Sequence, residues 1–443
     1  MGPRALVVGA GVSGLSSAYR LQQAGFRVQV LEASASIGGR MGSVEAGGFS
    51  MSRGALILPG AHRAIVALAA ELGLGELPPF HGTIAIEREG KLHRLRSDRL
   101  PIDGLRTELV SWRTKARLWR LALDGLRVMP KLSSLDISSA AAFDTQTALD
   151  YCERHLGAEA RDYLIGPVVR GLCERASIVE FFNASLNILG TGFLRFPGGI
   201  DFLVEALAAR VEVRTHARVT ALEPAGEGVR VRWEAHEAAS GQRVEHSEQV
   251  EACVLAVPAP AAAELYRAFD PEAAELLATR LPYNRAFLAH FCLSQRPPAP
   301  ALFILVPELE DPGMYCLSFE HALRPDTVPR GKGQLTASWS HAWCEAHREL
   351  NDDALLEQML PSVERLVPGV REQLELARVD RWDHAVLRGE PGYCAAIAEL
   401  GSRLDPRCPV QLASDYFTTS STNSSVLAGE RAAARLIETA GLS

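Results

Sequence analysis

Apolar and polar positions at the start of the chain follow the order strand, turn, helix, strand. Residues 4–8 form a short apolar run, glycines interrupt segment 9–14, and helical periodicity extends over 15–24. A second apolar run, 26–31, has the length and composition of a strand and ends at Glu32. This order predicts a βαβ unit of the dinucleotide-binding kind.

Three glycines in the turn have separate physical functions in such a unit. Gly9 permits a sharp turn, Gly11 lets the backbone approach a pyrophosphate, and Gly14 lets the helix pack closely on the strand. The pyrophosphate would lie at the helix N-terminus, where backbone N–H groups are free. Glu32 stands where a carboxylate accepts ribose hydroxyls, and its charge disfavours the 2′-phosphate of NADP. The predicted binding residues also include Val12, Ser13 and Ala33.

The middle and the end of the chain return to strand patterns. A helix through about residue 210 is expected to precede strands at 211–222, 228–233 and 244–257. Near the C-terminus, a strand pattern over 410–415 ends in Asp415. After a turn rich in Ser, Thr and Asn, a helix is expected over 426–439.

Two long segments, 81–195 and 266–404, separate these parts. The first is largely helical in pattern, and its stretch 105–132 carries seven basic residues among Leu and Trp. Such a stretch can lie on an anionic membrane surface, but a solvated helix face is favoured. The second segment predicts strands at 286–293, 301–306 and 333–339, and a helix over 354–366 that Pro361 can kink.

Composition and charge narrow the class of protein. A chain of 443 residues suits two domains, and its formal net charge of -7 gives no reason to expect nucleic-acid binding. The eight cysteines are scattered without a Cys-x-x-Cys pair, as expected for reduced thiols in the cytoplasm. No apolar run reaches the length of about 18 residues that a membrane-spanning helix needs.

The segment Ile37-Gly38-Gly39-Arg40, which follows Glu32, identifies a family resemblance. It resembles the second signature of the superfamily of flavin amine oxidases, protoporphyrinogen oxidases and carotenoid desaturases. The resemblance implies FAD in place of NAD, with Gly38 and Gly39 at the diphosphate and Arg40 beside it. A guanidinium is a well-matched donor for phosphate oxygens.

The same resemblance assigns further residues to FAD. Val219 would offer its backbone to the adenine edge, and Leu56 would pass beside the isoalloxazine. Asp415 would lie near the ribityl phosphate, and the helix that begins near Ser425 and Val426 would aim its N-terminus at the flavin. Its positive dipole would stabilise anionic reduced flavin.

Several residues depart from the family pattern. Ser414 stands where relatives have glycine, and Ser52 where they often have aspartate. Segment 421–426 follows the Ser-x-x-Gly-Ala-Val pattern only loosely. Some relatives tether the flavin through a cysteine before the last strand, but the surroundings of Cys394 and Cys408 resemble the non-covalent branches, so dissociable FAD is predicted.

The predicted fold class is α/β, with a Rossmann-type FAD-binding domain built on a parallel sheet and an interleaved α+β substrate domain. The predicted FAD domain is discontinuous and comprises 1–80, 196–265 and 405–443. The substrate domain comprises 81–195 and 266–404.

Chemistry on the substrate side is less specific. Trp382, Tyr393 and Tyr416 are candidates to line the substrate cavity, and ordinary core aromatics are an equal alternative. No metal site is predicted, because the spacing of His341, Cys344 and His347 takes the side chains off one helix face and no fourth ligand is near.

The predicted function is FAD-dependent removal of a hydride equivalent from a small organic substrate, lipophilic or amine-containing, in secondary metabolism. Protoporphyrinogen-oxidase-like or desaturase-like oxidation competes with amine oxidation. The alternative from a different class is a flavin-binding isomerase or a non-redox FAD protein. No general base is assigned, because the chain's only lysines, Lys91, Lys115, Lys131 and Lys332, lie in no recognisable motif.

Overall fold

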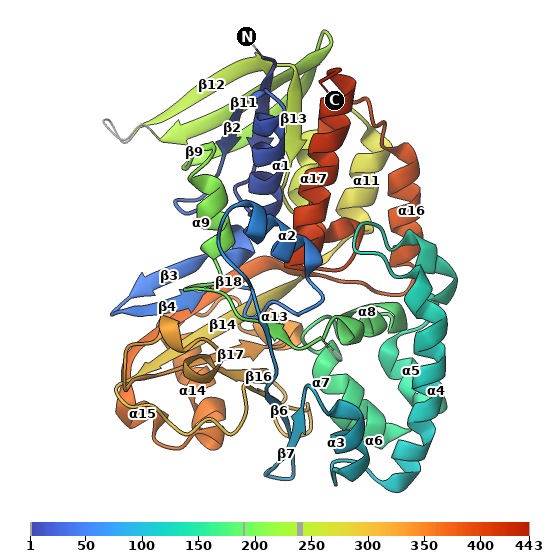
Figure 1. Ribbon diagram of the computed structural model, residues 1–443, viewed down its shortest axis with the longest axis vertical. Coiled ribbons are helices and arrows are strands. Elements are labelled where there is room, and N and C mark those ends of the chain that lie inside the picture. The colour runs from blue at the N-terminus through green and yellow to red at the C-terminus, as the bar shows by residue number, and fades with distance from the viewer. Residues whose placement is uncertain (1, 189–190, 237–241, 443) are drawn as a thin grey trace.

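A five-stranded parallel sheet forms one end of the molecule in the computed structural model, which describes residues 2–188, 191–236 and 242–442 (Figure 1). Its strands come from the first, middle and last parts of the chain. Their order across the sheet is β19 (Val410–Leu412), β13 (Ala252–Leu255), β1 (Arg4–Val8), β2 (Arg27–Leu31) and β9 (Glu212–Arg214). Because every pair is parallel, the carboxyl ends of all five strands lie at one edge.

The central strand β1 is covered on both faces because its side chains alternate. Ala5 and Val7 pack into a cluster with helices α1 (Val12–Gln23) and α17 (Thr422–Thr439). These two helices lie side by side (Figure 1). Leu6 and Val8 face the opposite cluster. That cluster includes a three-stranded antiparallel sheet of β10 (Ala217–Ala225), β11 (Gly228–His236) and β12 (Arg243–Val250).

A seven-stranded mixed sheet forms a second layer. Its order is β18 (Leu374–Leu387), β14 (Tyr283–Leu293), β17 (Gly333–Trp339), β16 (Met314–Phe319), β15 (Phe303–Leu305), β6 (Thr83–Arg88) and β7 (Lys91–Arg96). Helix α14 (Asp352–Leu366) packs against this sheet through a cluster that includes Leu355, Met359 and Val363. Pro361 lies inside this helix, which continues through it.

A helical region lies beside the mixed sheet. Helices α4 (Trp112–Val128), α5 (Ala148–His155) and α8 (Ile178–Ile188) share one apolar cluster. The remaining longer elements are α2 (Arg63–Glu71), α3 (Leu100–Arg106), α9 (Phe202–Ala208), α10 (Ala259–Tyr266), α11 (Pro271–Thr279), α13 (His341–Ala346), α16 (Tyr393–Arg403) and the hairpin of β3 (Ser43–Ala46) and β4 (Phe49–Ser52).

The predicted α/β class with a Rossmann-type parallel sheet is confirmed. The boundaries of the two domains stay a prediction. No helix within residues 2–188, 191–236 and 242–442 combines the length and the apolar character needed to cross a bilayer.

Some element boundaries differ from the sequence prediction. The strand expected over 244–257 is two strands in two sheets, because the chain leaves β12 at Val250 and enters the parallel sheet as β13 at Ala252. The basic stretch 105–132 is divided between two helices: α3 ends at Arg106, and α4 begins after Ser111, whose side chain accepts the Thr114 N–H. The strands expected at 228–233 and 244–257 extend toward each other, to His236 in β11 and back to Arg243 in β12, and 237–241 lie outside the described residues.

Candidate functional site

The turn after β1 is held by two glycines that the backbone crowds. Gly9 has a φ of +101°, and a Cβ there would lie 2.5 Å from the Ala256 carbonyl oxygen. A Cβ on Gly14 would lie 2.0 Å from the Gly9 carbonyl oxygen. Neither position therefore tolerates a side chain. At Gly9 both the positive φ and the close contact exclude it, and at Gly14 the close contact alone does.

Gly11 is different, because a Cβ there would meet no atom within 4 Å. The backbone of Gly38 bridges to Gly11, and the nearest neighbour of a Cβ on Gly39 would be the Gly11 Cα at 3.8 Å. Gly11 is also the N-cap of α1 and carries no side chain that could accept the first-turn N–H groups. The result is a backbone cradle with free donors, which fits a diphosphate approaching between the two glycine turns.

The carboxylate of Glu32 lies at the end of β2, beside this cradle. It accepts hydrogen bonds from the Ala10 N–H at 2.8 Å and from the Ser34 N–H and hydroxyl at 2.8 and 2.7 Å. The Glu32 carbonyl accepts the N–H of Ala217, the first residue of β10. The strand with Val219 therefore begins next to the Glu32 turn, and the exposed Ala33 follows directly.

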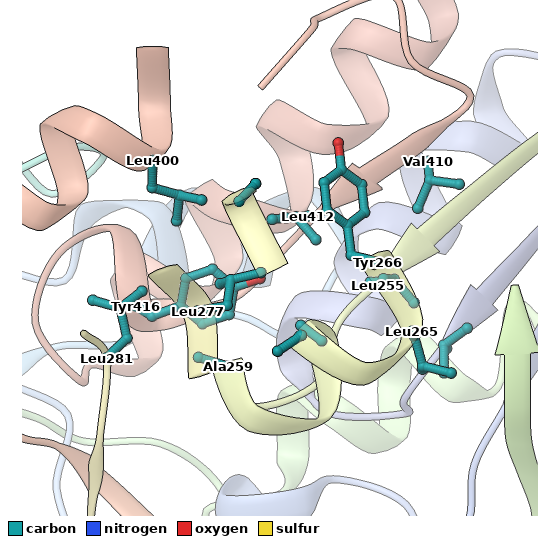
Figure 2. Close-up of a cluster of buried hydrophobic side chains, with 14 of the residues drawn as sticks. Leu255, Ala259, Leu265, Tyr266, Leu277, Leu281, Leu400, Val410, Leu412 and Tyr416 are labelled. Carbon is teal, nitrogen blue, oxygen red and sulfur yellow. The ribbon is translucent and has the colours of Figure 1, made fainter. Parts of the chain in front are cut away.

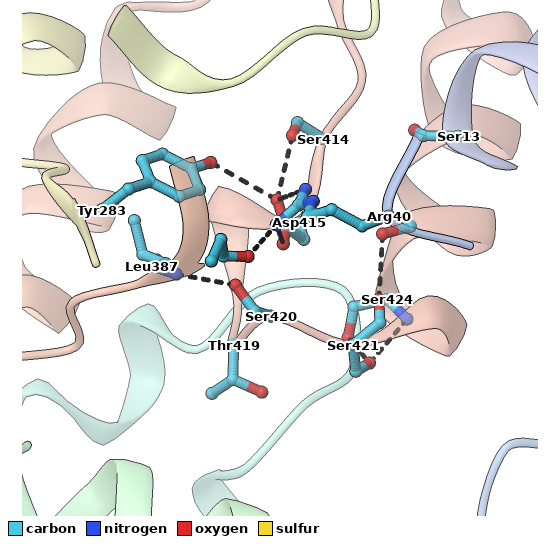
Figure 3. Close-up of polar contacts among 12 residues, drawn as sticks. Ser13, Arg40, Tyr283, Leu387, Ser414, Asp415, Thr419, Ser420, Ser421 and Ser424 are labelled. Carbon is cyan, nitrogen blue, oxygen red and sulfur yellow. Dashed lines mark hydrogen bonds and ion pairs between the residues drawn. The ribbon is translucent and has the colours of Figure 1, made fainter. Parts of the chain in front are cut away.

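An ion pair joins Arg40, near the start of the chain, to Asp415, near its end. The Arg40 guanidinium contacts both carboxylate oxygens of Asp415, at 2.8 and 3.1 Å, and donates to the Ala385 carbonyl oxygen at 2.8 Å (Figure 3). Asp415 also accepts hydrogen bonds from the Ser414 and Tyr283 hydroxyls, at 3.1 and 3.4 Å. Burial is the largest single influence and would raise the pKa of Asp415, but the Arg40 charge and the hydrogen bonds from Arg40, Ser420 and Ser414 together hold that pKa below its usual range.

The N-terminus of α17 lies beside this ion pair. Ser421 is its N-cap, and the hydroxyl accepts the Ser424 N–H at 3.0 Å (Figure 3). Helix α17 begins at Thr422, four residues before the predicted start at 426, and Ser425 and Val426 are buried as its fourth and fifth residues. A Cβ on Gly429 would lie 2.2 Å from the Ser13 carbonyl oxygen, so this glycine lets α17 pack directly on α1.

Leu56 lines a small pocket formed mainly by segments 56–58, 193–198 and 323–326. The cavity itself has a volume of only about 20 Å³ and is lined largely by apolar side chains, with two arginines and one aspartate. Its lining comprises Leu56, Ile57, Leu58, Phe80, Phe193, Leu194, Arg195, Phe196, Gly198, Leu323, Arg324, Pro325 and Asp326. Arg195 is exposed, and its guanidinium lies over the Phe80 ring at 4.7 Å.

The three aromatic residues predicted on the substrate side take different positions. The Trp382 indole N–H donates to the Arg53 carbonyl oxygen at 2.6 Å. Tyr393 is buried and its hydroxyl donates to the Thr418 carbonyl oxygen at 3.0 Å. Tyr416 is buried in an apolar cluster with Leu255 and other core residues (Figure 2), and its hydroxyl has no partner among the described residues. None of the three lines the pocket around Leu56, and their contact with substrate stays a prediction.

Two further groups near the site have no signal in the sequence. Tyr283, at the start of β14, reaches the Asp415 carboxylate only because the mixed sheet packs against the turn that follows β19. Glu180 on α8 is buried, and its Oε2 lies 3.3 Å from the Tyr393 hydroxyl. Burial, reinforced by the charges of Asp144 and Asp415, raises the pKa of Glu180 to about 8, so this carboxyl holds a proton at neutral pH.

The His-x-x-Cys-x-x-His segment makes bonds of its own. His341 Nδ1 accepts the Arg285 N–H, and His347 Nδ1 lies 2.7 Å from the Trp343 carbonyl oxygen. Among the residues that the structure describes, no three His, Cys, Asp or Glu side chains are arranged to hold a metal ion.

Comparisons with known proteins cover almost the whole chain. The family model described as flavin containing amine oxidoreductase matches residues 12–437. A segment of 173 residues is 33% identical to protoporphyrinogen oxidase 2 of Arabidopsis thaliana, and covers 38% of this chain and 32% of that protein. A segment of 249 residues is 27% identical to an L-amino-acid oxidase of Demansia vestigiata, with coverage of 52% and 47%.

Solved structures share the fold. The cyclohexylamine oxidase of Brevibacterium oxydans superposes with a TM-score of 0.75 at 20% identity over 99% of both chains. The matching segments thus span about a third to a half of the length of the curated relatives, whereas the family model and the fold extend along the chain. Together with the cradle at Gly11 and the Arg40–Asp415 pair, this match shows that the chain belongs to the flavin containing amine oxidoreductase family, with FAD as its cofactor.

Proposed function

We propose that this protein is an FAD-dependent oxidoreductase that removes a hydride equivalent from a small lipophilic or amine-containing molecule. The observation that carries the proposal is the convergence at one sheet edge of the Gly11 cradle, Glu32 and the Arg40–Asp415 pair. When bound, FAD supplies the electron-accepting group. Family membership over residues 12–437 supports the same reaction class, and nothing in the comparisons favours the isomerase alternative.

The chain's own residues would bind and orient the cofactor. Gly11 and the first turn of α1 would hold the diphosphate through backbone donors, and Glu32 would accept the ribose hydroxyls. Asp415 holds the Arg40 side chain in a fixed orientation, so the guanidinium donors that remain can face phosphate oxygens. Two helix N-termini, of α1 and α17, add positive dipole ends beside this edge.

The side chains around Leu56, rather than the size of the cavity there, support a substrate with a substantial apolar part. Its walls are mainly aliphatic and aromatic, with Phe80 and Phe193 close together at a ring separation of 5.9 Å. Arg195 adds one exposed cation at the rim. Such a lining suits a hydrophobic molecule that carries a polar or anionic substituent.

We further propose that FAD is held without a covalent bond and that the protein acts in the cytoplasm. Burial raises the pKa of both the Cys394 and the Cys408 thiols, which disfavours the reactive thiolate. All eight cysteines are free thiols, as expected in a reducing compartment.

The experiment that tests the redox function is anaerobic mixing of the purified yellow protein with candidate substrates. The panel comprises a cyclic amine, a diamine, L-amino acids and protoporphyrinogen. We expect at least one of them to bleach the flavin absorption, and admission of oxygen or another acceptor to restore it. Conversion of a substrate with the flavin unbleached would instead establish the isomerase alternative.

A further inference from the structure

Helix α4 presents an apolar stripe to solvent. Trp112, Trp119 and Leu126 are 71%, 64% and 63% exposed, and Leu123 and Ala116 complete the row. At 100° per residue, these five positions point within about 40° of one direction. The stripe therefore extends along the whole helix on a single face.

The opposite face of α4 already forms the contact with the protein core. Gly125 lies so close to α8 that a Cβ there would be 3.2 Å from the Phe182 ring. Val128 is buried in the same cluster, and Leu118 and Leu121 pack against it. The exposed stripe is thus a second apolar face, in addition to the one that folding requires. In Figure 1, α4 runs along the outer edge of the molecule, with α5 and α8 on its inner side.

Exposed apolar side chains are concentrated around this helix. Among the described residues, all but two of the exposed large hydrophobic side chains lie between 102 and 135, the exceptions being Leu309 and Leu442. Those outside α4 are Ile102 and Leu105 on α3, Met129 just after α4, and Leu135. A contiguous exposed apolar surface of this kind on a folded domain marks an interaction site.

The charge beside the stripe is positive on a protein that is negative overall. Segment 99–131 contains eight Lys and Arg against three Asp and Glu, whereas the whole chain carries -7. Arg113, Arg120 and Arg127 follow one flank of the stripe at seven-residue intervals, and Arg120 and Arg127 share an ion pair with Asp124. On the other flank, the Lys115 Nζ lies 4.5 Å from the centre of the Trp112 ring.

These features together favour a lipid surface over a protein partner. Indole side chains at the level of lipid headgroups, leucines below them and basic side chains that extend outward are the pattern of a helix lying in the plane of a membrane interface. If two copies of α4 packed antiparallel about a two-fold axis, the Arg113 flank would meet itself, which like charges oppose. The charge instead complements anionic lipid headgroups.

We propose that the surface formed by α3 and α4 docks the protein reversibly on anionic bilayers. Trp112, Trp119 and Leu126 would enter the headgroup region, while Arg113 and Lys131 would contact anionic headgroups. Docking depends on no flavin chemistry and is therefore tested independently of the proposed oxidoreductase function. It would place the enzyme where lipophilic substrates are concentrated.

Vesicle co-sedimentation of the FAD-bound protein tests the proposal. The vesicles are pure phosphatidylcholine, or phosphatidylcholine with about 30 mol % phosphatidylserine. We expect binding to the anionic vesicles that weakens at about 0.5 M salt, and little binding to the neutral ones. The double variant Trp119→Ser/Leu126→Ser should lose at least about tenfold in apparent affinity, because its apolar contact is removed.

Two further variants separate the alternatives. Arg113→Glu/Lys131→Glu should weaken binding to anionic vesicles only, because it reverses charges and leaves the apolar stripe intact. Leu442→Ser removes an exposed leucine next to the C-terminus, which lies at the opposite end of the molecule from α3 (Figure 1), and should bind like wild type. Flavin absorption and far-ultraviolet circular dichroism establish that each variant is folded.

Three results would overturn the proposal. The first is absence of binding to either vesicle by the folded wild type. The second is equal binding by wild type and Trp119→Ser/Leu126→Ser. The third is a dimer in light scattering that this double variant converts to a monomer without any vesicle binding, which would assign the stripe to a second copy of the chain.

Discussion

The buried carboxyl of Glu180 makes the stability of the fold depend on pH. Its pKa of about 8 in the folded protein contrasts with about 4.3 for an exposed glutamate in an unfolded chain. The folded state therefore holds this proton more tightly than the unfolded state. That contribution to stability is fully present below the unfolded pKa and is lost as pH rises through the folded pKa.

Replacing Glu180 by glutamine removes this dependence. The amide keeps the shape of the protonated side chain and its contact with the Tyr393 hydroxyl, but it cannot ionise. At about 1.36 kcal/mol per pKa unit, the free energy of unfolding of Glu180→Gln relative to wild type should rise by about 3.5 kcal/mol between pH 5 and pH 8. The variant should be close to wild type at pH 5 and distinctly more stable at pH 8.

Urea unfolding of both proteins at pH 5, 6.5 and 8 measures this difference. The exposed Glu76 is the matched control, since Glu76→Gln should give a difference that does not change with pH. A difference between Glu180→Gln and wild type that is flat with pH, or that falls as pH rises, would refute a protonated Glu180. Because both proteins share every other titrating group, the comparison isolates this carboxyl.

The remaining predictions concern the cofactor site. Gly11→Ala should weaken FAD binding at least about tenfold, as measured by flavin fluorescence titration. Because the added Cβ meets open space, the free energy of unfolding of the apoprotein should change by less than about 0.5 kcal/mol. Gly14→Ala, the matched control, should destabilise the apoprotein by about 1–3 kcal/mol because its Cβ meets the Gly9 carbonyl; equal stability of the two variants would contradict this. Asp415→Asn should weaken FAD binding at least about tenfold, because it leaves Arg40 without its charged partner, and unchanged affinity would show that the ion pair is not part of the site. Acid precipitation should release the yellow colour into the supernatant, and colour retained in the pellet would indicate a covalent flavin.

Much of the candidate site could be located from local sequence. The glycines of the first turn, Glu32 and Gly38-Gly39-Arg40 lie within forty residues, and each is tied to strand ends that apolar periodicity reveals. Asp415 could be found for a similar reason, as an acid shortly after a strand, although β19 ends at Leu412, three residues before it. Helix α17 begins earlier than its sequence indicates, because Thr422, Asn423 and Ser424 have the composition of a turn but lie inside the helix.

The contacts between these motifs could not be predicted in the same way. Arg40 and Asp415 meet because β1, β2, β13 and β19 align in parallel in one sheet, and no local pattern specifies that two residues so far apart in sequence form an ion pair. Tyr283 and Glu180 are ordinary residues in their own segments. Their environments depend on which layers pack together, and burial, rather than residue type, shifts the pKa of Glu180.

Helix α4 shows most clearly which properties the sequence determines and which only the tertiary structure decides. Apolar periodicity and basic residues indicate an amphipathic helix, but Leu118, Leu121 and Val128 form one apolar face while Trp112, Trp119 and Leu126 form another. Local periodicity cannot tell which face the core will cover, because both are apolar. Close packing of Gly125 on Phe182 decides it, and this tertiary contact leaves the tryptophan face in solvent.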